Sequence, residues 1–193
     1  MTAPQFYLAS ASPRRRQLLE QLGLRFEMAA ADVDETPHAG EPARDYVLRL
    51  ARLKAETAAK RMGYPTLPVL AADTAVVLDG AILGKPRDRD DALSMLARLS
   101  ARSHQVLSAI ALWQPGMLTA VVNESQVRFR AVSPQEALAY WDTGEPRDKA
   151  GAYGIQGLGG LFVEHLEGSY SGVMGLPLFE TAALLREAGV SVL

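Results

Sequence analysis

Cysteine is absent from this chain of 193 residues, and histidine is scarce. Without cysteine, the protein has no disulfide framework, no thiolate nucleophile and no cysteine-ligated metal. The three histidines, His38, His104 and His165, do not have the spacing of a zinc site. The absence of cysteine also favours a reducing compartment, so we expect a cytoplasmic protein.

The sequence also lacks an excess of one charge and a long hydrophobic run. Its 20 basic and 22 acidic residues leave a net charge of −2, so no global basic field favours stable nucleic-acid binding. The N-terminus has no basic region followed by a long apolar stretch, and Asp73 interrupts the apolar segment 67–78. We therefore expect neither an export signal nor a membrane span.

Helical and extended patterns alternate along a chain whose length suits one domain, residues 1–193, which could be bilobal. The patterns predict strands at 5–9, 67–78, 81–83, 104–113, 117–132 and 161–165, and helices that begin near residues 13, 42, 89, 134 and 177. Asp79-Gly80 is typical of a hairpin turn, so some strands are antiparallel. The expected fold is therefore α/β, with a mixed β-sheet flanked by helices.

Three consecutive arginines, Arg14, Arg15 and Arg16, stand at the start of the first predicted helix. Ser12 is a suitable N-cap, and it follows a short strand and Ser10. Cations in a first turn oppose the helix dipole, whereas a phosphate there would be bound by free N–H groups, hydroxyls and guanidinium groups. A solvated basic turn is the alternative, but this convergence favours phosphate binding.

Charged residues in apolar surroundings give further candidates. Asp73 lies within an apolar strand, beside Thr74, and must be paired, bound to a metal or directed into a cleft. Lys54 falls on the apolar face of the helix 42–62, although such lysines more often extend to solvent. The acidic segment 32–35, which includes Glu35, carries little weight by itself because acidic loops are usually only solvated.

Two turns complete the set of candidates. Gly84-Lys85-Pro86-Arg87-Asp88 places Lys85 at a defined position, although an ordinary charged turn is an equal alternative. The segment 151–160 surrounds Tyr153 and Gln156 with glycines, and it predicts either a flexible loop or a backbone that approaches a ligand closely. Its spacing matches neither the dinucleotide-binding fingerprint nor the Walker pattern.

Seven segments in order resemble the Maf family of nucleoside triphosphate pyrophosphatases, and they span nearly the whole chain. They are Leu8-Ala9-Ser10-Ala11-Ser12-Pro13-Arg14-Arg15, Asp34-Glu35, Arg52-Leu53-Lys54-Ala55, Ala72-Asp73-Thr74, Gly84-Lys85-Pro86-Arg87-Asp88, Asp148-Lys149-Ala150-Gly151-Ala152-Tyr153-Gly154-Ile155-Gln156-Gly157 and Val173-Met174-Gly175-Leu176-Pro177. One departure is Gly172, where many members carry asparagine.

The resemblance implies a fold similar to that of the inosine triphosphate pyrophosphatases, with two lobes around a cleft, and usually a homodimer. It implies hydrolysis of a nucleoside triphosphate to the monophosphate and pyrophosphate, with sanitation of the nucleotide pool as its purpose. Asp73, Glu35 and Lys85 would be catalytic, and Glu35 and Asp73 would hold Mg²⁺ or Mn²⁺. The substrate-binding residues would be Ser10, Ser12, Arg14, Arg15, Lys54, Thr74 and Gln156.

Three of these positions indicate the subfamily. Members similar to this chain at Arg14, Thr74 and Gln156 prefer dTTP and UTP, including modified uridine triphosphates, whereas members that prefer 7-methylguanosine triphosphate carry tryptophan, glutamine and glutamate. We therefore expect a dTTP/UTP pyrophosphatase. The alternatives are a 7-methylguanosine triphosphate pyrophosphatase and a non-catalytic nucleotide-binding regulator of septum formation in cell division.

Overall fold

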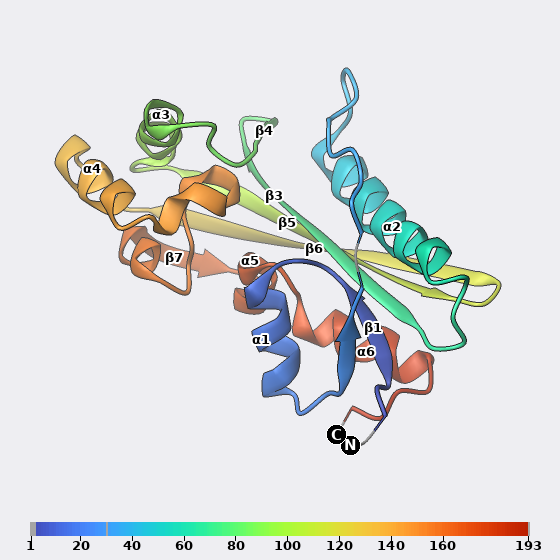
Figure 1. Ribbon diagram of the computed structural model, residues 1–193. Helices are drawn as coiled ribbons and strands as arrows, with labels where there is room; N and C mark the ends of the chain where they lie inside the picture. The colour runs from blue at the N-terminus through green and yellow to red at the C-terminus, as the bar shows by residue number, and fades with distance from the viewer. Residues whose placement is uncertain (1–2, 30, 193) are drawn as a thin grey trace. The chain divides into compact units, whose positions relative to one another are not determined.

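A computed structural model describes residues 3–29 and 31–192 (Figure 1). The chain divides into two compact units. Unit 1 contains the chain up to Asp73, Ser108–Asn123 and the chain from Gly175 onward, and unit 2 contains Thr74–Leu107 and Glu124–Met174. Among the described residues, no helix is both long enough and apolar enough to cross a bilayer.

A seven-stranded mixed sheet provides the framework. Its strand order is β2-β1-β3-β5-β6-β7, and β4 pairs with β3 outside that path. The strands are β1 (Phe6–Ala9), β2 (Phe26–Met28), β3 (Val69–Leu78), β4 (Ala81–Leu83), β5 (Ser103–Gln114), β6 (Met117–Phe129) and β7 (Val163–Glu167). β1 runs parallel to β2 and β3, whereas β3–β4 and β6–β7 are antiparallel. The predicted mixed sheet with flanking helices is therefore confirmed.

Unit 1 contains the parallel strands β1 and β2, the first part of β3 up to Asp73, and the helices α1 (Pro13–Gln21), α2 (Ala43–Arg61) and α6 (Leu178–Glu187). The predicted apolar face of α2 is buried, and it includes Val47, Leu50, Ala51, Ala55 and Ala58. Such a face forms because residues three and four apart lie on one side of a helix. β3 is almost completely buried, as expected for an interior strand that is covered on both faces.

Unit 2 contains α3 (Arg89–Leu99), α4 (Pro134–Asp142), α5 (Tyr170–Met174) and three short 3₁₀ segments at Glu145–Asp148, Ala150–Ala152 and Leu158–Phe162. α3 and α4 lie next to each other (Figure 1). Asp88 caps α3, and Ser133 forms the predicted capping box with Glu136 at the start of α4. Asp79 and Gly80 both have positive φ, at 51° and 78°, as the predicted hairpin turn requires.

Candidate active site

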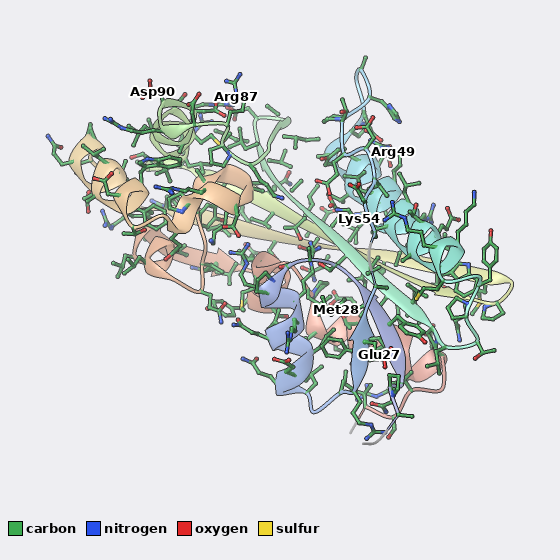
Figure 2. All side chains as sticks on the ribbon, in the orientation of Figure 1. Glu27, Met28, Arg49, Lys54, Arg87 and Asp90 are labelled. Carbon is green, nitrogen blue, oxygen red and sulfur yellow. The ribbon has the colours of Figure 1, made fainter. Side chains whose placement is uncertain are left out.

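Lys54 connects two carboxylates in unit 1. Its Nζ lies 2.7 Å from Asp73 Oδ1 and 2.6 Å from Glu35 Oε1. The Lys54 side chain is only 11% exposed because it extends from the buried, apolar face of α2, the helix that also carries Arg49 (Figure 2). The structure thus unites three predicted site residues from a loop, a helix and a strand. It also contradicts the alternative in which Lys54 extends to solvent.

Asp73 is a buried carboxylate on an interior strand. Its side chain is 9% exposed, whereas that of Glu35 is 48% exposed. Burial raises the pKa of Asp73 above its ordinary value, and the positive charges of Lys54 and Arg15 oppose this rise. A buried carboxylate with a raised pKa binds a proton more readily than a surface carboxylate does, which is what a general base requires.

Side chains of α2 hold the loop that carries Glu35. Tyr46 Oη donates a hydrogen bond to the Glu35 carbonyl at 3.0 Å, and burial raises the pKa of Tyr46 to about 12. Arg49 forms a bidentate pair with Glu41 at 2.6 and 2.7 Å and also donates to the Thr36 carbonyl at 3.2 Å. The helix that carries Lys54 therefore also fixes the backbone at Glu35 and Thr36.

The three arginines of the first helix differ in their contacts. Arg15 Nε donates to the Gly175 carbonyl at 2.8 Å, and its Nη1 donates to the Ala72 carbonyl at 2.8 Å and to Ser10 Oγ at 3.2 Å. Burial lowers the pKa of Arg15. Arg16 instead forms an exposed pair with Glu20 on its own helix. Arg15 therefore fixes the backbone next to Asp73, which sequence reasoning did not anticipate.

Ser12 is the N-cap of α1 and Pro13 begins the helix, as predicted. The Ser12 side chain makes no capping hydrogen bond, and instead the Ser12 N–H donates to Ser10 Oγ at 3.2 Å. Arg14 is half-buried at the same turn, and the first turn contains no acidic residue. The cation-rich helix start predicted to bind phosphate is therefore present in unit 1.

Thr74, Lys85 and Gln156 belong to unit 2, and the structure describes them there. Thr74 follows Asp73 in β3 and is half-buried, whereas Lys85 and Gln156 are exposed. The Gly84 carbonyl, next to Lys85, accepts a hydrogen bond from the Gly151 N–H at 3.0 Å. The Lys85 turn is thus tied to the start of the glycine-rich segment.

The glycine-rich segment is not an open loop. It forms turns and short 3₁₀ segments, and β7 begins at Val163 rather than at residue 161. A Cβ on Gly151 would lie 2.9 Å from the Val76 side chain, and a Cβ on Gly159 would lie 2.6 Å from Tyr140 Oη. Here the glycines allow the protein to approach itself closely, whereas the sequence suggested the approach of a ligand.

A family model described as Maf-like protein matches residues 5–188. This chain belongs to the Maf family. Its relatives include proteins named dTTP/UTP pyrophosphatase from Bordetella pertussis, 56% identical over 98% of this chain and 95% of the relative, and from Pasteurella multocida, 51% identical over the full length of both. A third relative with this name, from Methylobacillus flagellatus, is 53% identical over 97% of this chain and 94% of its own length.

One solved structure, that of the Staphylococcus aureus Ham1 protein, aligns with a TM-score of 0.45 and 18% identity over 64% of this Maf-family chain and 71% of that protein. A likeness this distant does not establish a shared fold or activity. The expected similarity to inosine triphosphate pyrophosphatases, with a cleft between two lobes, therefore stays a prediction.

Glu35 and Asp73, the two carboxylates paired with Lys54, are the candidate metal ligands of this Maf-family chain. Within residues 3–29 and 31–192, no group of three or more histidine, aspartate or glutamate side chains is arranged to hold a metal ion. Glu35 and Asp73 nevertheless share one cation, the Lys54 ammonium. One or two carboxylates are a typical protein contribution to Mg²⁺, for which phosphates and water supply the other oxygens. The donor set therefore fits Mg²⁺ or Mn²⁺ bound together with a triphosphate.

Proposed function

We propose that this chain hydrolyses dTTP and UTP, and modified uridine triphosphates, to the nucleoside monophosphate and pyrophosphate, and so removes unwanted nucleotides from the pool. The geometry that carries the proposal is the buried Asp73 carboxylate held by Lys54 next to Glu35. The pyrimidine substrates are proposed because relatives 51–56% identical to this chain have the name dTTP/UTP pyrophosphatase.

In the proposed reaction, Asp73 accepts a proton from a water molecule while that oxygen forms a bond to the α-phosphorus. The bond from this phosphorus to the bridging oxygen breaks, and the oxygen leaves as part of pyrophosphate. The raised pKa of Asp73 suits this role because the carboxylate must hold the proton that it receives. Lys54, Lys85 and Arg14 would neutralise phosphate charge, and Ser10 and Ser12 would donate hydrogen bonds.

For Arg15 we propose a positioning role in addition to its positive charge. Its three hydrogen bonds to Gly175, Ala72 and Ser10 hold the backbone on which both Asp73 and the phosphate-binding turn depend. Thr74 and Gln156 would select the base, and the Gln156 amide can both donate to and accept from a uracil or thymine edge.

We further propose that Glu35 and Asp73 hold Mg²⁺ or Mn²⁺ when the triphosphate binds. A divalent ion supplies Lewis-acid polarisation of phosphoryl oxygens and neutralises their charge. A homodimer is proposed from the family resemblance, and a cytoplasmic location from the absence of cysteine. Light scattering would test the first, and fractionation of the source cells would test the second.

Pyrophosphate release from dTTP, UTP, CTP and 7-methylguanosine triphosphate, with Mg²⁺ or Mn²⁺ and with excess chelator, tests the proposal. We expect dTTP and UTP to react fastest and the chelator to stop the reaction. Asp73→Asn should lower kcat by roughly a hundredfold or more, because asparagine cannot accept the proton. Asp90→Asn is the matched control, since Asp90 is exposed in the first turn of α3 (Figure 2), and it should retain parental activity.

Normal turnover in Asp73→Asn would remove this residue from the catalytic role. Undiminished activity in excess chelator would refute the requirement for a divalent metal. Tight binding of dTTP by the parent protein without any pyrophosphate release would instead support the non-catalytic regulator.

A further inference from the structure

Gln156 is exposed on a tight turn in unit 2. The Gly157 N–H donates to the Gly154 carbonyl at 3.3 Å, so Ile155 and Gln156 are the two central residues of this turn. An exposed turn of this kind is ordinarily mobile, and a mobile glutamine discriminates poorly between base edges because binding must first order it. The contacts at the two ends of the turn therefore decide how well Gln156 is positioned.

Both ends of the turn are bound to one pair of side chains, Glu145 and Tyr140. Glu145 Oε2 accepts a hydrogen bond from the Leu158 N–H at 2.9 Å, and its Oε1 accepts from the Gly159 N–H at 3.2 Å. Tyr140 Oη donates to Glu145 Oε1 at 2.7 Å and accepts from the Gly154 N–H at 3.0 Å. The pair thus holds the backbone immediately before and after the turn.

The packing around Glu145 and Tyr140 leaves no room for a side chain at the neighbouring glycines. A Cβ on Gly157 would collide with both carboxylate oxygens of Glu145, and a Cβ on Gly159 would lie 2.6 Å from Tyr140 Oη. The absence of side chains at these two positions lets the carboxylate lie directly against the backbone. The glycines and Glu145 therefore fit together closely on either side of Gln156 in the sequence.

Glu145 and Tyr140 are themselves fixed in place. Tyr140 is buried on α4, and Glu145 begins the 3₁₀ segment that follows, after Gly144 with φ of 78°. The Glu145 N–H donates to Thr143 Oγ1 at 3.2 Å, and Thr143 Oγ1 donates to the Tyr140 carbonyl at 2.6 Å. Partial burial raises the pKa of Glu145, but hydrogen bonds from Tyr140 and the two backbone amides outweigh it and lower the pKa overall. Glu145 is therefore an ionised acceptor at neutral pH.

We propose that Glu145 and Tyr140 are positioning residues for base selectivity, and that they act by holding the turn that presents Gln156. This inference rests on the proposed function, in which Gln156 recognises the uracil or thymine edge. Glu145 does not touch the substrate in this proposal. It restricts the directions in which the Gln156 amide can point, so that a matching base edge is favoured over a mismatched one.

The test compares UTP with CTP, because they share the sugar and the triphosphate and differ only at the base edge. Glu145→Gln keeps the size of the side chain but turns one of its acceptors into an NH₂ group that faces backbone N–H donors. We expect the ratio of kcat/KM for UTP over CTP to fall roughly tenfold, mainly through KM for UTP, while kcat stays within about threefold of the parent. Tyr140→Phe is a second, milder variant and should change the ratio in the same direction.

Glu136→Gln is the matched control. Glu136 also accepts several hydrogen bonds in unit 2, from Ser133 and Arg130, but its contacts hold the start of α4 and not the turn of Gln156. This variant should lose thermal stability and keep the parental UTP-over-CTP ratio. Amide hydrogen exchange over residues 154–159 should become at least about tenfold faster in Glu145→Gln and stay unchanged in Glu136→Gln.

Each contrary result is informative. Unchanged exchange over residues 154–159 in both Glu145→Gln and Tyr140→Phe would show that the pair does not hold the turn. Faster exchange with an unchanged UTP-over-CTP ratio would show that holding the turn does not set selectivity, and either result overturns the proposal. A parent protein that hydrolyses neither nucleotide would overturn the proposed function, and the inference with it, whatever the exchange data show about the turn.

Discussion

Replacing Lys54 by methionine tests how the buried carboxylate of Asp73 is stabilised. Methionine is similar in length to lysine but has no charge, so the substitution removes the contacts of 2.7 Å to Asp73 and 2.6 Å to Glu35 and keeps the packing of α2. The Glu35 side chain is 48% exposed and can recover hydration, whereas the Asp73 side chain is 9% exposed and cannot. The cost therefore falls mainly on Asp73.

We expect Lys54→Met to lower the free energy of unfolding by about 3–5 kcal/mol at pH 8, the typical cost of leaving one partner of a buried ion pair alone. Two unit charges 4 Å apart interact by about 4 kcal/mol at an effective dielectric constant of about 20, which agrees with this size. Burial already raises the pKa of Asp73, and the loss of Lys54 raises it further. A raised folded-state pKa lowers stability as pH rises through it, so the cost should be smaller at pH 5 than at pH 8, because protonation of Asp73 becomes more favourable as pH falls.

Urea unfolding at pH 8 and pH 5 measures this difference. Lys60→Met is the matched control because Lys60 is exposed in the last turn of α2, and it should cost little at either pH. Adding Asp73→Asn to Lys54→Met should restore part of the stability at pH 8, because no buried charge is then left alone. An equal loss of stability in Lys54→Met at both pH values, or a loss no larger than that of Lys60→Met, would show that Lys54 does not stabilise the buried Asp73 carboxylate.

Two further predictions concern pH and selectivity. Burial lowers the pKa of His104 to about 4. The unfolded state therefore binds more protons than the folded state between about pH 6.5 and 4, and about 3 kcal/mol of stability should be lost as pH falls through that range. His104→Gln should remove this part of the pH dependence in unfolding curves, exposed His165→Gln should keep it, and equal curves for the two variants would contradict the assignment. Replacing Arg14, Thr74 and Gln156 together by tryptophan, glutamine and glutamate should lower the ratio of kcat/KM for dTTP over 7-methylguanosine triphosphate, and an undiminished ratio in an active triple variant would refute the subfamily assignment.

Periodicity predicted the helix of Lys54 and its buried face, because both depend on residues close together in the sequence. It could not predict the partners of Lys54. Asp73 is 19 residues away in the chain, and its side chain meets Lys54 only because α2 and β3 fold together. The sequence thus indicated that Asp73 must be paired, bound to a metal or directed into a cleft, and the fold determined that it pairs with Lys54.

Other features depended on contacts too distant for a sequence pattern to reveal. The glycines near Gln156 face Glu145 and Tyr140, so their close approach to the protein could not be distinguished from close approach to a ligand. The hydrogen bonds of Arg15 reach Ala72 and Gly175, 57 and 160 residues away. β2 and α5 have three and five residues, too few to show a period, and were not predicted, whereas the equally short β4 was indicated by the Asp79-Gly80 turn.

The bond between Arg15 and the Gly175 carbonyl also has a consequence for the order in which the protein matures during synthesis. Unit 1 draws on three separate stretches of chain, and its final stretch starts at Gly175, whereas all of unit 2 lies before that residue. The ribosome therefore makes every residue of unit 2 before it makes the last part of unit 1. Arg15 cannot form this hydrogen bond until Gly175, 160 residues downstream, has been synthesised, so the backbone beside Asp73 completes its hydrogen bonding late. A nascent chain that stalls before Gly175 therefore contains the candidate catalytic residues but lacks the hydrogen bond from Arg15 to Gly175.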